Sequence, residues 1–160
     1  MIKSMFLSSN IPDEEKNMER KVICFYIDLL NRILGLKIKD LRFKKDIKHP
    51  LLTEGDGNAA GITVFETFAR KNRESWDVSK QHKEAITARI ILLIFRLENY
   101  RPLGVKSLTK NLTMAQKTVT QVGNELGCHL NKTKNASGSH DVLELKLPLF
   151  KPRLARNKRR

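Results

Sequence analysis

Short polar side chains recur in the segment that ends at Gly127, at a spacing that an α-helix would place on one face. These residues are Gln116, Lys117, Thr120, Gln121 and Asn124. Residues three and four apart are neighbours on a helix, so the five side chains would form a single polar face. Amide and hydroxyl groups of this kind can bond phosphate oxygens or base edges. The pattern predicts a surface that meets nucleic acid, and the competing interpretation is an ordinary solvated helix face.

Positive charge is concentrated in the second half of the chain. The 160 residues carry a formal net charge of +14, and residues 101–160 hold 13 Lys and Arg against 3 Asp and Glu. An uncompensated positive field attracts polyanions by releasing their condensed counterions. Only Lys117 is charged on the polar face, and Lys132 and Lys134 add charge at a nearby loop. We therefore expect contacts with the phosphate backbone more than readout of bases.

The last ten residues, 151–160, carry six basic side chains and no acidic one. Such a block repels itself and has nothing to bury, so we predict a disordered basic tail. The tail also fits a nuclear import signal, and its alternative role is merely to keep the chain soluble. The tail cations that we expect at nucleic acid are Arg153, Arg156, Lys158, Arg159 and Arg160.

The elements that would position the polar face occupy residues 79–150. Ser79 is a helix cap before a helix at 80–98, whose apolar run 90–95 should be central to the fold. A short helix at 105–110 follows, and Thr113 with Gln116 forms a capping-box pattern for the next helix. In that helix Val119 and Val122 should face the core, while Leu108 and Leu112 should anchor the turn before it. Strands at 128–132 and 142–147 then flank a loop at 133–141. This order is that of a winged helix, a helix-turn-helix with a β-hairpin appended.

The first part of the chain, 10–78, shows the same order less clearly. A helix at 10–34 should bury one apolar stripe, and a basic helix at 38–46 should follow it. The stripe consists of Met18, Val22, Phe25, Leu29 and Ile33. A glycine-rich break at 54–61 precedes a hairpin whose strands we expect at 63–68 and 74–78. The fold class is therefore mainly α with small β-hairpins, arranged as tandem winged-helix units at 10–78 and 79–150.

Several function classes are disfavoured by the sequence. The longest apolar run has six residues, far below the roughly 20 that a membrane span needs. Cys24 and Cys128 are too few for a disulfide scaffold, and no second Cys/His pair lies at metal-ligand spacing from Cys128 and His129. No catalytic triad or phosphate-binding glycine loop is visible. We expect no enzyme activity, no cofactor and no metal.

Three stretches resemble the C-terminal region of the forty-nine-kilodalton subunit family of RNA polymerase I, also called polymerase-associated factor fifty-three. They are KEAITARIILLI from Lys83, LTKNLTMAQKTVTQV from Leu108 and LGCHL from Leu126. The strand from Leu143, the proline after it and the basic tail also agree, and the resemblance covers roughly residues 20–160. It implies a tandem winged-helix domain, similar to that of the general factor TFIIE, that binds DNA. The domain would be docked on polymerase I in the nucleolus of the nucleus, where it aids initiation and elongation of ribosomal RNA precursor synthesis.

The sequence departs from this family pattern in two ways. Members also carry an N-terminal β-barrel that pairs with a smaller subunit, and this chain has no such region, so we do not expect that heterodimer. Residues 54–61 replace the expected recognition helix of the first unit with glycine-rich sequence, so the sequence does not predict whether this unit contacts DNA.

Two other functions remain open: a scaffold that docks polymerase subunits without DNA contact, and an RNA-binding ribosome-assembly protein. Aromatic residues for base stacking would favour the latter, but they make up only 6% of the chain. Moreover, we expect Phe25, Phe65, Phe68 and Phe95 to be internal.

Overall fold

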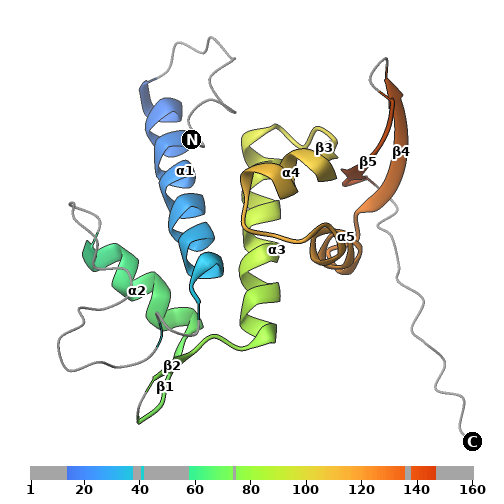
Figure 1. Ribbon diagram of the computed structural model, residues 1–160. Coiled ribbons are helices and arrows are strands. Elements are labelled where there is room, and N and C mark those ends of the chain that lie inside the picture. The colour runs from blue at the N-terminus through green and yellow to red at the C-terminus, as the bar shows by residue number, and fades with distance from the viewer. Residues whose placement is uncertain (1–13, 38–40, 42–57, 74, 136–137, 147–160) are drawn as a thin grey trace, which may run out of the picture.

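The computed structural model describes residues 14–37, 41, 58–73, 75–135 and 138–146. Within these ranges the chain is mainly helical with two small antiparallel sheets (Figure 1). The helix expected at 38–46, apart from Leu41, the break before residue 58 and the basic tail lie outside the described residues. None of the helices in the described ranges has the length and apolar character to span a bilayer.

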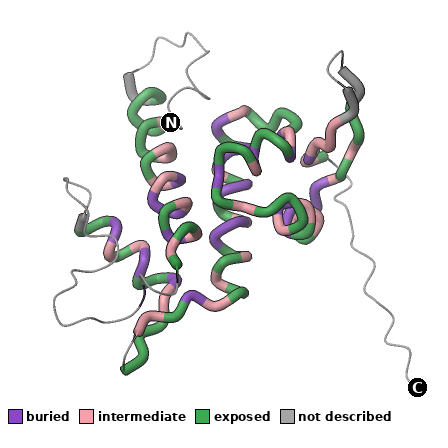
Figure 2. The backbone as a smooth tube through the Cα atoms, viewed as in Figure 1, coloured by how far each residue is buried: buried purple, intermediate pink, exposed green. Residues whose placement is uncertain are grey.

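Two long helices form the centre of the molecule, α1 (Glu14–Gly35) and α3 (Lys80–Leu97). They lie side by side and run antiparallel (Figure 1). Near one end of the pair the Arg20 guanidinium donates to the carbonyl of Leu97 at 3.3 Å. Further along, Arg89 donates to the Tyr26 hydroxyl at 3.2 Å. The core lies between these helices and the elements around them, as Figure 2 shows by the buried segments that face each other.

Helix α3 confirms the sequence prediction at its start and through most of its apolar run. The Ser79 hydroxyl accepts a hydrogen bond from the backbone N–H of His82 at 3.2 Å, which caps the first turn. Most of the run is buried, namely Ile90, Ile91, Ile94 and Phe95. Leu92, however, is exposed, so the run is not enclosed on every side.

The apolar stripe predicted for the first helix is only half correct. Leu29 and Ile33 are buried, but Met18, Val22 and Phe25 are exposed. The buried positions of α1 are completed by Ile27 and Leu30, on the side that faces α3. The pattern misled because α2 lies beside only the C-terminal half of α1, so the N-terminal half of the stripe has no described neighbour (Figure 1).

The strand predicted at 63–68 is wrong, because these residues belong to helix α2 (Asn58–Phe68). Gly61, Phe65 and Phe68 are buried at intervals of four and three, which is the helical period. Burial of the two phenylalanines outweighs the β-propensity of Thr63 and Val64. The helix also includes the last four residues of the predicted glycine-rich break.

A short hairpin is present, but only its second strand falls within a predicted strand, and its first strand comes after residues 63–68. Strand β1 (Arg70–Lys71) pairs antiparallel with β2 (Trp76–Asp77), and the Asn72 N–H donates to the Ser75 carbonyl across the turn at 2.8 Å. The Trp76 ring packs edge-on against Phe65, with ring centroids 5.2 Å apart. This contact fixes the hairpin to α2.

The second half follows the predicted order of helices and strands. Its elements are β3 (Leu103–Gly104), α4 (Val105–Asn111), α5 (Gln116–Glu125), β4 (His129–Asn135) and β5 (Gly138–Glu144). The three strands form an antiparallel sheet in the order β3-β5-β4. Residues 103–104 form a further strand, because they pair with β5. One expectation needs correction: most of the predicted loop at 133–141 lies in β4 and β5.

The start of α5 differs from the predicted capping box. Its N-cap is Ala115, which has no side chain that could make the capping bond. The backbone N–H of Thr113 instead donates to Asn31 Oδ1 of α1 at 2.7 Å. This bond ties the turn between α4 and α5 to the first helix, and Leu108 and Leu112, at the end of α4, are buried as predicted. Gly127, at φ 85°, ends α5 as expected.

Candidate nucleic-acid interface

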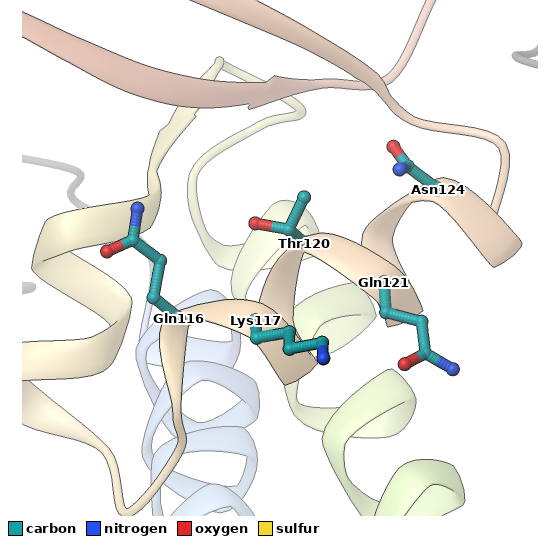
Figure 3. Close-up of a pocket in the computed structure, with 5 residues that line it drawn as sticks. All are labelled: Gln116, Lys117, Thr120, Gln121 and Asn124. Carbon is teal, nitrogen blue, oxygen red and sulfur yellow. The ribbon is translucent and has the colours of Figure 1, made fainter.

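The five polar residues predicted from the sequence do lie together on the outer face of α5. Gln116, Lys117, Thr120, Gln121 and Asn124 line a wide, open depression (Figure 3). Val119 and Val122 are buried on the opposite side of the helix, against the core that includes α3. This division between an apolar inner side and a polar outer side places all five groups where an external ligand could reach them.

A close contact at Gly123 sets the distance between α5 and the hairpin. A Cβ atom at this position would lie 2.7 and 2.9 Å from the two Cδ atoms of Leu143, which is fully buried on β5. Real Cβ atoms do not approach other carbons so closely. The absence of a side chain at Gly123 therefore allows the helix and strand β5 to pack directly against each other.

Two carboxylates border the polar face, and both bind amides on it. Gln116 Nε2 donates to Asp141 Oδ2 of β5 at 3.5 Å, a long hydrogen bond. Gln121 Nε2 donates to Glu125 Oε1 at 3.0 Å within α5. Sequence reasoning missed both acids. Glu125 was detectable four residues after Gln121, but Asp141 could be found only with the hairpin register.

The cations predicted for the site are only partly described. Lys117 is exposed on α5, and Lys132 is exposed on β4 directly across the hairpin from Asp141. The backbone of Lys134 lies opposite Ser139, while its side chain and the five tail cations lie outside the described residues. Among described side chains, Lys117 and Lys132 therefore balance Glu125 and Asp141. The polar face itself is close to neutral.

An ion pair lies at the base of the hairpin. Lys146 Nζ donates to Glu144 Oε2 at 2.9 Å, and Asn131 donates to the same oxygen. The hydrogen bond from Lys146 is the main cause that lowers the pKa of Glu144 below its ordinary value. Lys146 is thus engaged within the hairpin.

No metal site is found in the part of the chain that the structure describes. There, no three His, Cys, Asp or Glu residues converge on one point. Cys128 is buried, and burial raises the pKa of its thiol; the neighbouring His129 is half-buried. A protonated buried thiol is a poor metal ligand.

Comparison with models of protein families identifies a match. The model of the family described as "A49-like RNA polymerase I associated factor" matches residues 4–152, which is nearly the whole chain. No curated protein matches the sequence. The family match confirms the resemblance identified from the residues and extends it upstream of residue 20.

Proposed function

The chain belongs to the family of A49-like RNA polymerase I associated factors, and from this membership we propose that it is a non-catalytic, DNA-binding region of a polymerase I subunit. It supports initiation and elongation of ribosomal RNA precursor transcription. Its place is the nucleus and, within it, the nucleolus.

We further propose that the chain consists of two winged-helix units, 10–78 and 79–150, followed by the basic tail 151–160. Support for the second unit comes from the order α3, β3, α4, α5, β4 and β5, in which a helix-turn-helix is followed by a two-stranded wing. Support for the first unit is the order α1, α2 and the hairpin of β1 and β2. Helix α2 begins within the predicted break, which supports a third helix for this proposed unit.

The observation that carries the DNA-binding proposal is the gathering of five polar side chains on the outer face of α5, beside the β4–β5 hairpin. Gln116, Thr120, Gln121 and Asn124 seat the helix on a groove. The cations Lys117, Lys132, Lys134 and those of the tail neutralise phosphates. Such binding selects weakly among sequences and depends steeply on salt, with a slope of about −0.9 in log K per log salt for each phosphate neutralised.

A charge-reversal variant of the hairpin tests this proposal. Lys132→Glu with Lys134→Glu should weaken binding to all duplex sequences alike and make the salt slope shallower by roughly one for each lysine that contacts a phosphate. Fluorescence anisotropy of labelled duplexes across a salt series measures both quantities. The matched control, Lys21→Glu with Lys83→Glu, makes the same charge change on α1 and α3 and should have a much smaller effect. Equal losses in the two variants would indicate attraction to net charge alone, and losses that depend on base sequence would indicate base readout.

A scaffold that docks polymerase subunits without DNA contact is the second candidate, and the near-neutral charge around α5 favours it. Deletion of residues 151–160 separates the two functions. A DNA-binding α5 surface should retain measurable DNA affinity without the tail, whereas the scaffold should lose all of it. Competition with single-stranded RNA in the same assay tests the RNA-binding alternative.

A further inference from the structure

Three apolar side chains form an exposed stripe along the N-terminal half of α1. Met18, Val22 and Phe25, which we call the α1 stripe, are 61%, 59% and 47% exposed. Their spacing of four and three residues places them on one face of the helix. Scattered surface leucines are ordinary, but an aligned series of large apolar groups indicates an interaction site.

The stripe continues into an interface that is already buried within the fold. Leu29 and Ile33 follow at the same helical spacing, and both are buried. They belong to the C-terminal half of α1, the half beside which α2 lies (Figure 1). One apolar face of α1 is thus covered along its C-terminal half and open along its N-terminal half. An apolar face of a partner that lies in line with α2 would complete this packing.

Helix α3 adds an exposed apolar side chain beside the α1 stripe. Leu92 is 43% exposed and lies between Arg89 and Arg96 on α3. Arg89 donates to Tyr26, and Arg96 forms an ion pair with Glu19. Along α1, Val22 lies between these two contacts. Because residues spaced by three and four share a helix face, Leu92 lies along the same α1–α3 seam.

Cations outnumber acids around the stripe. Among the described side chains, Lys21 and Arg32 flank it on one side, and Arg89 and Arg96 lie on the α3 side. Of the acids whose side chains are described there, Asp28 is paired with Arg32 and Glu19 with Arg96. The surface therefore suits an apolar partner face bordered by acidic residues. A second copy of this chain, with its net charge of +14, would be repelled.

The stripe and the α5 face are separated by α3. Helix α3 contacts α1 on one side and α5 on the other, so the two surfaces lie on different sides of the molecule (Figure 1). A protein partner on α1 would leave the α5 depression accessible to DNA.

We propose that the α1 stripe is the surface by which this chain docks on RNA polymerase I, and that its occupant is an apolar, acid-bordered face of a polymerase subunit. The identity of the partner rests on the proposed function, while the position of the surface rests on the exposed residues of α1 and α3. DNA binding by α5 is not needed for the docking.

The experiment measures binding of the full 160-residue chain to purified RNA polymerase I from which this factor has been removed. The variant Met18→Gln, Val22→Gln, Phe25→Gln should raise the Kd for the polymerase by about tenfold or more, because it removes central apolar contacts. Its Kd for duplex DNA and its Tm should stay close to wild type, since the three side chains are exposed. The matched control, Leu130→Gln, changes an exposed leucine on β4 and should leave polymerase binding unchanged.

An unchanged Kd for the polymerase in the triple variant would overturn the proposal. If the Tm of the triple variant falls while its polymerase binding is unchanged, the chain itself covers the stripe. If light scattering shows that the wild-type chain is a dimer and the triple variant a monomer, a second copy covers the stripe. Where both Tm and polymerase binding fall, Lys21→Glu decides, because it removes no apolar contact: weaker binding that depends on salt supports the docking surface, and wild-type binding refutes it.

The same assays distinguish the two proposals. If the unmodified chain binds DNA but not the polymerase, the docking surface alone is refuted. If the unmodified chain binds the polymerase but not DNA, the proposed DNA contact is refuted and the proposed docking surface is unaffected.

Discussion

The two helices on either side of α3 present opposite kinds of surface. Helix α5 buries its valines and exposes amides, a hydroxyl and one lysine, with acids close by. Helix α1 buries one apolar side and leaves part of a second apolar stripe uncovered. A polar, near-neutral face suits adaptable hydrogen bonding, whereas an apolar stripe with a cationic border suits a protein partner. The net charge of +14 therefore does not by itself locate the proposed DNA contact.

The largest expected difference in the free energy of unfolding is between substitutions of two phenylalanines in the first half of the chain. Phe65→Ala removes a fully buried ring that packs on Trp76 and should lower the free energy of unfolding by about 3–5 kcal/mol. Phe25→Ala, on the exposed stripe, should change it by less than about 0.5 kcal/mol. Chemical denaturation of both variants measures the difference. A comparable loss for Phe25→Ala would show that the stripe is packed within the folded chain.

The close packing of α5 on β5 gives the next largest effect. Gly123→Ala gains about 1 kcal/mol of helix propensity, but its Cβ meets the buried Leu143 at under 3 Å, and overpacking costs about 1–3 kcal/mol. We expect a net loss of stability and weaker DNA binding, because the hairpin must move away from the helix. The control is Gly35→Ala, whose Cβ would meet Thr113 at an ordinary 3.8 Å and should not lower the Tm. A Gly123→Ala variant as stable as wild type would show that the spacing between helix and hairpin is not constrained.

A smaller effect should follow from neutralising the acid beside α5. Asp141→Asn removes a negative charge that would face phosphates beside Gln116. It also removes the negative charge opposite Lys132 on the hairpin. DNA affinity should rise by about twofold to fivefold at low salt, as an exposed charge interaction of about 1 kcal/mol or less allows. Anisotropy titrations at two salt concentrations measure this change. If DNA affinity is unaffected, the acid does not lie near the bound phosphates.

Most of the second half could be predicted from the sequence because its signals are local. Ser79 caps a helix, Gly127 ends one, and the valines at 119 and 122 alternate with polar residues at the helical period. The five residues of the polar face followed from that period alone. Partners from other elements did not: β3 is defined by its pairing with β5, and Asp141 reaches Gln116 only through the hairpin register.

The first half was harder to predict because tertiary contacts determine its secondary structure and which of its apolar residues are buried. The residues from Thr63 to Phe68 have β-propensity, yet the burial of Phe65 and Phe68 makes them helical. The periodicity of α1 identified an apolar stripe, but a period cannot say how far a neighbouring helix extends along it. Met18, Val22 and Phe25 were therefore assigned to a core that does not reach them.

The most direct test of the proposed DNA-binding surface is a backbone amide chemical-shift map of the full chain titrated with duplex DNA. We expect the largest shifts on residues 116–125 of α5 and on β4, with little change along residues 14–25 of α1. Shifts concentrated on α1, or an α5 helix that does not respond at saturating DNA, would contradict this proposal.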